Sequence, residues 1–185
     1  MTKIETKKET KKTDELKRCE DFARKILFNA RRGDYERAGD ISEEIGLFPE
    51  ARNFYVGASK KNRQNGDLPS ALRTAVKSGD RELELKVRLK YGNELQEKGD
   101  LYNAARVLFD GNLTDEAYKI AIKSQDARTL ELSGDIANSR NNEFWEIRAE
   151  DAYRMAIRAY NLICILKGED TTESVRVLVE KLKKL

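Results

Sequence analysis

The sequence predicts an all-α fold, a right-handed α-solenoid in which antiparallel helix hairpins stack on one another. Glycine–aspartate pairs begin at Gly33, Gly66 and Gly99, and a repeat period in the thirties is typical of stacked helical hairpins. The 185 residues include only two prolines and many strong helix formers such as Glu, Lys, Leu and Ala. No segment shows the period-two alternation of apolar residues that is typical of strands.

About ten helices are expected from the apolar periodicity and the glycine–aspartate pairs. Glycine suits the end of a helix, where a left-handed residue costs it little, and aspartate caps the next helix by accepting bonds from free backbone amides. The first helix is expected from Asp14 to about Arg32. The others are expected over residues 35–45, 49–62, 68–78, 81–98, 101–110, 115–124, 127–140, 144–167 and 171–184.

The two ends of the chain are predicted to differ from the repeats between them. Residues 1–12 are rich in lysine and poor in apolar residues, so we predict a disordered basic tail there, followed by a single helical-repeat domain over residues 13–185. The helix over residues 171–184 is predicted to cap that domain by burying Val175, Leu178, Val179 and Leu182. Exposure of Val175, Leu178 and Val179 would instead allow copies to stack edge to edge, as in a structural oligomer or coat component.

A short motif of small residues recurs along the chain. Gly66 is followed five residues later by Ala71 and then by Ala75, and Gly46 is followed in the same way by Ala51. Alanine on one face of a helix lets two helix axes approach, and the residue one turn later fills the groove beside it. One hairpin cannot bury its own apolar face, so neighbouring hairpins are expected to stack.

This motif resembles the tetratricopeptide repeat, whose helix pairs carry small residues at the eighth, twentieth and twenty-seventh positions and a turn residue, often glycine, at the fifteenth. Gly39, Gly46, Ala51 and Ala58 match these four positions, and Tyr55 stands at the usual aromatic position. The early tryptophan and the terminal proline of the family are missing. Clathrin-type and transport-coat α-solenoids, which also have short and loose hairpins, are the related alternative.

Two further parts of the chain match the repeat less completely. Gly92, Gly99 and Ala104 fit a second unit, with Gly111 where alanine is usual. Gly134 opens a possible third unit, but an insertion around residues 138–142 displaces its second helix. The resemblance therefore implies a divergent TPR-like helical-repeat domain.

The composition argues against an enzyme and against a cofactor or metal. The chain contains no histidine, the commonest general base and metal ligand, and its two cysteines are too far apart for a zinc-binding spacing. No glycine-rich phosphate-binding motif occurs. Cys19 and Cys164 lie among apolar residues at helical spacing, and we predict that both are buried as small apolar side chains.

The sequence predicts a cytoplasmic protein without a membrane span. Its N-terminus has no apolar segment of the kind found in secretory signals, and its longest apolar run, residues 162–166, is too short to cross a bilayer. Lysine and arginine total 36 against 33 aspartates and glutamates. Because both signs are interspersed, the small net charge of +3 does not by itself identify a partner.

The resemblance implies that partner-facing residues lie near the fifth, ninth and twelfth positions of each repeat. The candidates for partner binding at these positions are Glu36, Asp40, Glu43, Asn93, Glu131 and Asp135. An acidic groove would favour a partner segment that carries lysine or arginine. The alternative is that these carboxylates only keep the helices soluble and pair with nearby cations.

Trp145 is a further candidate for partner binding. It follows Phe144 in the irregular segment after the insertion, and tryptophan is favoured at interface hot spots. The alternative is that Trp145 packs in the core.

The expected function is non-enzymatic protein–protein interaction, as a scaffold or adaptor that holds a segment of another protein on a helical-repeat surface. Nucleic-acid association through the basic tails is the alternative, since the pI is about 8.7 and some helical repeats bind RNA. A structural oligomer is the third. The sequence leaves open the partner and the oligomeric state.

Overall fold

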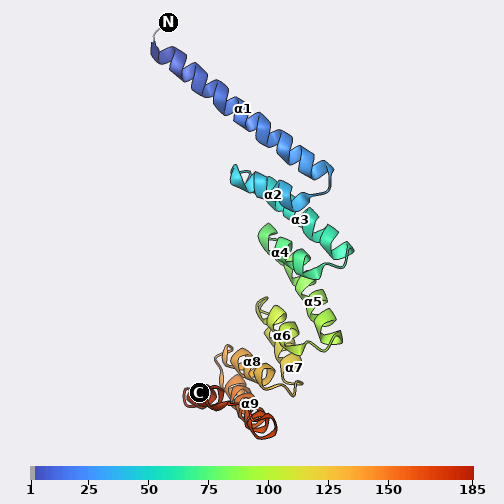
Figure 1. Ribbon diagram of the computed structural model, residues 1–185, viewed down its shortest axis with the longest axis vertical. Helices are drawn as coiled ribbons and strands as arrows, with labels where there is room; N and C mark the ends of the chain where they lie inside the picture. Colours follow the sequence, from blue (N-terminus) through green and yellow to red (C-terminus); the bar gives the residue numbers. More distant parts are fainter. Residues whose placement is uncertain (1–2) are drawn as a thin grey trace. The chain divides into compact units, whose positions relative to one another are not determined.

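The computed structural model describes residues 3–185, and their side chains from residue 17 onward. This part of the chain folds into ten α-helices without a strand, in the order drawn in Figure 1. The helices are α1 Lys3–Arg31, α2 Tyr35–Glu44, α3 Phe48–Gln64, α4 Leu68–Ser78, α5 Arg81–Glu97, α6 Leu101–Phe109, α7 Thr114–Ala121, α8 Ala127–Asn138, α9 Glu143–Lys167 and α10 Thr172–Leu182. The all-α prediction is confirmed, and helices that follow one another in sequence contact one another.

The first helix differs most from its expected bounds. It begins at Lys3 rather than at Asp14, because lysine and glutamate have good helix propensity and extend the helix without apolar periodicity. The disorder expected over residues 1–12 stays a prediction, since residues 1–2 and the side chains up to residue 16 lie outside the described part of the chain.

The glycine–aspartate pairs end one helix and begin the next, as predicted. Gly33, Gly66 and Gly99 have φ angles of 74°, 79° and 79°, in the left-handed region where a side chain would be strained. The aspartates that follow them, Asp34 and its equivalents at 67 and 100, accept a hydrogen bond from the amide three residues later. The pairs at Gly39 and Gly134 lie inside α2 and α8 instead.

The chain divides into two compact units, Met1–Val87 and Arg88–Leu185. The division falls within α5, whose first half belongs to one unit and whose second half belongs to the other.

The first unit is held together by small clusters between consecutive helices. Ile26 of α1 packs with Ala38 and Ile41 of α2, and alanines of α4 pack with two residues of α5. Between α3 and α4, the buried Ser59 hydroxyl donates a hydrogen bond of 2.8 Å to the carbonyl oxygen of Ala71. Such a bond requires two helix backbones at close approach, which small residues permit.

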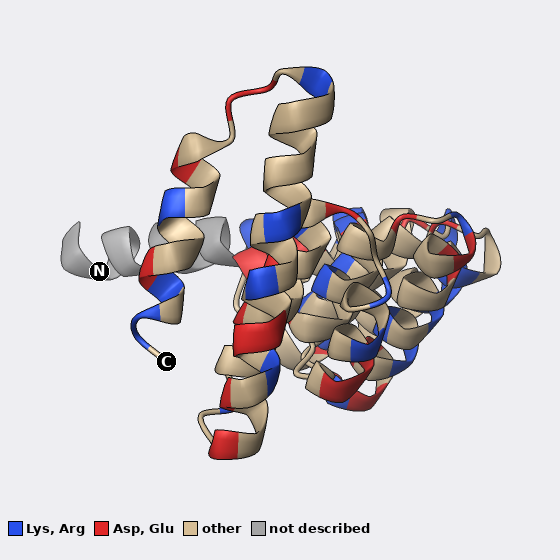
Figure 2. Cartoon of the chain, turned by 90° about the horizontal axis from the view of Figure 1, so that it is seen from below, with Lys and Arg blue, Asp and Glu red and all other residues tan. Residues whose placement is uncertain are grey.

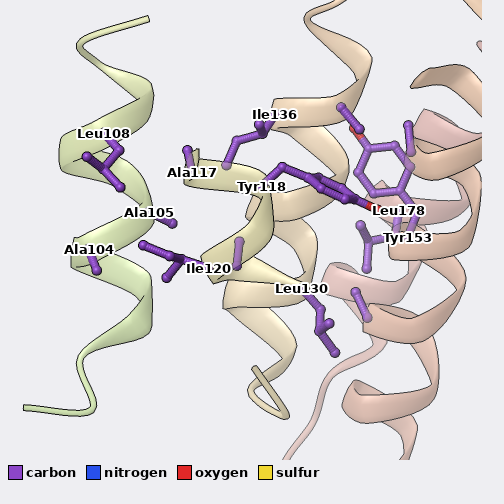
Figure 3. Close-up of a cluster of buried hydrophobic side chains, with 14 residues drawn as sticks. Ala104, Ala105, Leu108, Ala117, Tyr118, Ile120, Leu130, Ile136, Tyr153 and Leu178 are labelled. Carbon is purple, nitrogen blue, oxygen red and sulfur yellow. The ribbon is translucent and has the colours of Figure 1, made fainter. Parts of the chain in front are cut away.

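The second unit has one continuous core, drawn in Figure 3. It combines Leu108 of α6, Tyr118 of α7, Ile136 of α8 and Tyr153 of α9 with Leu178 of α10. Leu178 is fully buried, so α10 covers part of this core. Val175 and Leu182 are half-buried. The predicted burial of Val179 is wrong: it is exposed, because consecutive helical residues point about 100° apart around the axis.

Candidate interaction surfaces

The predicted acidic residues of the first unit belong to a network that joins α2, α3 and α4. The Tyr55 hydroxyl of α3 lies 2.9 Å from an Asp40 carboxylate oxygen and 2.7 Å from one of Glu43. From α4, the Lys77 ammonium donates to Asp40 at 3.0 Å and to Glu36 at 3.5 Å. The same ammonium lies 5.2 Å from the centroid of the Tyr55 ring, a cation–π distance.

The predicted acidic residues of the second unit belong to a similar network, which joins α8, α9 and α10. The Tyr153 hydroxyl of α9 donates to Asp135 at 2.7 Å. From α10, the Lys181 ammonium donates to Asp135 at 2.7 Å and to Glu131 at 3.0 Å, and it lies 5.5 Å from the centroid of the Tyr153 ring. The Tyr160 hydroxyl donates to Glu131 at 3.3 Å.

The two networks are copies of one three-helix arrangement. On the first helix, glutamate is followed three residues later by glycine and then aspartate, beginning at Glu36 and at Glu131. The second helix carries a tyrosine, Tyr55 or Tyr153, with an alanine four residues before it and another three residues after it. The tyrosine ring lies against the glycine of the first helix. The third helix supplies the lysine. The longer loop over residues 139–142 shifts Tyr153 along the sequence but not out of this arrangement.

The middle of the chain shows what happens where the tyrosine is missing. Gly92 of α5 lies against Leu108 of α6, so an apolar side chain stands where the other two glycines meet tyrosine. The residue after Gly92 is the exposed Asn93 instead of an aspartate. The acid is thus present only where a phenol hydroxyl needs an acceptor, which indicates that its first role is within the fold.

The pKa shifts within the networks follow from these contacts. Burial alone would raise the pKa of Asp40, but hydrogen bonds from Lys77 and Tyr55 hold it below its ordinary value of 3.8. The hydrogen bond that Lys77 donates to Asp40 raises the pKa of Lys77. Burial alone would lower the pKa of Lys181, yet hydrogen bonds to two carboxylates raise it. Burial and carboxylate acceptors raise the pKa of Tyr55 and of Tyr153. At neutral pH each network therefore contains a neutral phenol and paired opposite charges.

Trp145 lies at the start of α9, in a cluster of aromatic and arginine side chains. The side chain of Asn142 caps this helix by accepting from the Trp145 amide at 3.2 Å. The Trp145 ring is half-buried and meets the ring of Tyr118 edge-on, with centroids 5.2 Å apart. Arg148 places its guanidinium carbon 4.2 Å from the Phe144 ring centroid, 5.0 Å from that of Trp145 and 5.5 Å from that of Tyr118.

A shallow pocket of about 220 Å³ lies within this cluster, lined by Asp115, Tyr118, Lys119, Trp145 and Arg148. Trp145 therefore packs on one side and lines the pocket on the other. Asp115 already forms an ion pair with an arginine of the α8–α9 loop. Among residues 17–185, neither Lys119 nor Arg148 has a carboxylate partner. The pocket thus combines aromatic walls with two unpaired cations.

Two apolar surfaces of the chain were missed by the sequence reasoning. The first is a groove of about 850 Å³ in the first unit, between α1 and the end of α2, which we call the α1–α2 groove. It is lined by Arg18, Cys19, Phe22, Ala23, Ile26, Leu27, Ile45 and Leu47. Ile26 at its base is buried against α2, with Phe22 and Ile45 partly buried beside it. The apolar side chains of Ala23, Leu27 and Leu47 along the groove are exposed.

The second apolar surface is the end of α9 over residues 162–166, which we call the α9 end. Leu162, Ile165 and Leu166 are 55, 78 and 72% exposed. In Figure 2 the turns of α9 just below its blue upper end are tan, because no charged residue lies between Arg158 and Lys167. A helix segment that is apolar all round is normally buried, so this exposure marks a surface without its neighbour.

The predicted burial of the two cysteines is wrong, and the same surfaces explain why. Cys19 and Cys164 are both free and exposed. Cys19 lines the α1–α2 groove, and Cys164 lies within the α9 end. Apolar neighbours at helical spacing predicted an apolar face correctly, but among the described residues no helix packs over the cysteine itself in either face.

Neither metal binding nor membrane insertion finds support in the described residues. No group of three or more cysteine, aspartate or glutamate side chains there is placed to hold a metal ion. None of the described helices is long and apolar enough to cross a membrane.

Comparison with protein-family models, with curated proteins and with solved structures finds no match to this chain. The structure therefore defines the class of protein no further than consecutively packed helices, an arrangement compatible with a helical-repeat fold.

Proposed function

We propose that the chain is a TPR-like scaffold that binds a segment of a partner protein, without catalysis, at the cluster around Trp145. The observation that carries this proposal is Arg148, a cation held over three aromatic rings at the edge of a pocket and without a carboxylate partner among residues 17–185. Tryptophan, tyrosine and arginine are the residues most enriched at the centres of protein interfaces. Phe144 and Ile147, 59 and 56% exposed beside them, extend the apolar area.

The chemistry of the cluster favours a partner segment in which aspartate or glutamate stands next to an apolar side chain. The carboxylate would meet Arg148 and Lys119, since arginine binds carboxylates with paired, charge-assisted hydrogen bonds. The apolar side chain would lie on Phe144 and Ile147. A segment rich in lysine is less favoured, because the acids expected to attract it already bond to lysines of the chain itself.

We further place this scaffold in the cytoplasm. Both cysteines are free thiols exposed to solvent, and exposed thiols persist in reducing compartments.

A peptide-display selection tests the proposal and does not require that the partner be identified first. Random peptides are selected on the wild-type chain and counter-selected on Arg148→Met, a variant that keeps the length of the side chain but removes its charge. The matched control is Arg158→Met, which changes an exposed arginine of the same helix that lies outside the cluster. We expect the surviving peptides to carry an acid beside an apolar residue.

The selected peptides should then bind Arg148→Met about tenfold or more weakly than wild type, because a hydrogen bond to a charged group contributes roughly 1.5–3 kcal/mol. Binding to Arg158→Met should be unchanged. Selection of lysine-rich peptides, or equal binding to both variants, would contradict the proposal. If a single-stranded oligonucleotide binds instead and loses affinity in Arg148→Met, the cluster stacks bases and the partner is a nucleic acid.

A further inference from the structure

The α1–α2 groove and the α9 end are two exposed apolar surfaces of the same chain. One is a concave apolar surface and the other is the apolar end of a helix. A helix laid into an apolar groove is a common mode of protein recognition. A groove of about 850 Å³ falls within the range of roughly 300–1,000 Å³ that encloses a drug-sized ligand, so it has room for several side chains.

The charges around the two surfaces are also opposite. Between residues 17 and 32, α1 and the turn after it carry six basic residues, Lys17, Arg18, Arg24, Lys25, Arg31 and Arg32, against the two acids Glu20 and Asp21. The α2 end on the other side of the groove adds two exposed acids, Glu43 and Glu44, so basic residues outnumber acids by six to four around the groove. The α9 end is followed by one exposed base, Lys167, and two exposed acids, Glu169 and Asp170, so acids are in excess there. Pairing groove with groove would bring two basic helices together, and pairing two α9 ends would bring two acidic loops together. Groove with α9 end is the combination that the charges favour.

We propose that copies of this chain associate head to tail, with the α9 end of one copy docked in the α1–α2 groove of the next. This inference is independent of the proposed function, because it uses neither Trp145 nor Arg148. The contact is heterologous, so two docked copies still have one free groove and one free α9 end, to which further copies can be added. Association is therefore not limited to a dimer.

The chain's own cysteines provide a specific test. The sequence contains two cysteines, one in the α1–α2 groove and the other in the α9 end, and docking brings them close across the contact. Cys19→Ser keeps only the thiol of the α9 end, whereas Cys164→Ser keeps only the thiol of the groove. The two variants are treated with a short bismaleimide, separately and as a mixture, and the products are separated on a denaturing gel.

We expect a cross-linked dimer in the mixture and little in either variant alone. Adding Ile165→Lys to the chain that retains Cys164 should weaken the association about tenfold or more, because it removes one buried isoleucine from the contact. The matched control in that chain is Val76→Lys, which also changes an exposed apolar residue in the last turn of a helix and should leave the yield unchanged. Sedimentation of the wild-type chain should show an average mass that keeps rising with concentration.

Several results would overturn the inference. Equal cross-linking of Cys164→Ser alone would show that grooves pair with grooves, in a closed dimer. A cross-link within single wild-type chains, with none in the mixture, would show that the two surfaces meet inside one molecule. A constant monomer mass at all concentrations would show that they do not associate.

Discussion

Replacing Gly39 by alanine should destabilise the first unit, although alanine is the better helix former. Gly39 lies inside α2, where alanine is favoured over glycine by about 1 kcal/mol. A Cβ atom at this position would lie only 2.7 Å from Cε1 and 2.8 Å from Cδ1 of Tyr55. Ring atoms must therefore move if alanine is to fit.

The Tyr55 ring is poorly able to move, because its hydroxyl is bonded to Asp40 and Glu43 and its face is covered by Lys77. Overpacking of a tightly filled site costs about 1–3 kcal/mol, and a fixed ring favours the upper part of that range. After the gain in helix propensity is subtracted, we expect Gly39→Ala to lower the free energy of unfolding by about 1–2 kcal/mol.

Gly57→Ala is the matched control in the neighbouring helix α3. Its Cβ would lie 3.5 Å from the Tyr35 ring, an ordinary contact, so this variant should gain about 0.5–1 kcal/mol from helix propensity alone. Urea unfolding followed by far-UV circular dichroism gives both free energies by linear extrapolation. If Gly39→Ala proves as stable as wild type, the idea that the network fixes the Tyr55 ring is refuted.

Two further predictions concern the same networks. Tyr153→Phe removes the hydroxyl that donates to Asp135 and should lower the free energy of unfolding by about 1 kcal/mol; Tyr91→Phe, in a tyrosine outside the networks, should change the urea midpoint little. Stability should also fall as the pH rises above about 10, because the pKa of Lys77, of Lys181 and of Tyr153 is raised in the folded chain. A group whose folded pKa is raised stabilises the fold fully below its unfolded pKa and loses that contribution as the pH rises. Urea midpoints measured on either side of pH 10 check the direction, and no decrease would contradict it.

The helices could be predicted from the sequence because their signals are local. The bounds of α4 agree with the expected 68–78, and α9 ends at Lys167 as expected. The αL glycine and the capping aspartate act within a few residues of one another, so their sequence pattern contains the whole interaction. The same local signals correctly predicted that Glu36 and Asp40 lie on one helix and that Glu131 and Asp135 lie on another.

The partners of those acids could not be predicted, because they come from another part of the chain. Lys77 lies thirty-seven residues from Asp40, and Lys181 lies forty-six residues from Asp135. The sequence nevertheless contained a repeated pattern that could have indicated these lysines. In both halves of the chain a glutamate, a glycine–aspartate pair and a tyrosine precede the lysine in the same order. The exposure of Cys19 and Cys164 could not be predicted from any sequence pattern. Periodicity identifies an apolar face of a helix, but it does not show whether another element covers that face.

The two networks also bear on where this chain can bind anything. In a stack of hairpins each helix buries its apolar face against the next, so apolar side chains that stay exposed mark surface that the stack itself does not use. The acids predicted to line a binding groove are instead bonded within the fold, to Lys77 and Lys181 on the third helix of each network, as the alternative interpretation of the sequence expected. Exposed apolar side chains occur on several helices, but among the large apolar side chains of the described residues the largest exposed fractions are those of Ile165 and Leu166 in the α9 end, and the exposed Leu27 lines the α1–α2 groove. In the head-to-tail arrangement proposed above, each copy would cover one of these two surfaces on the next.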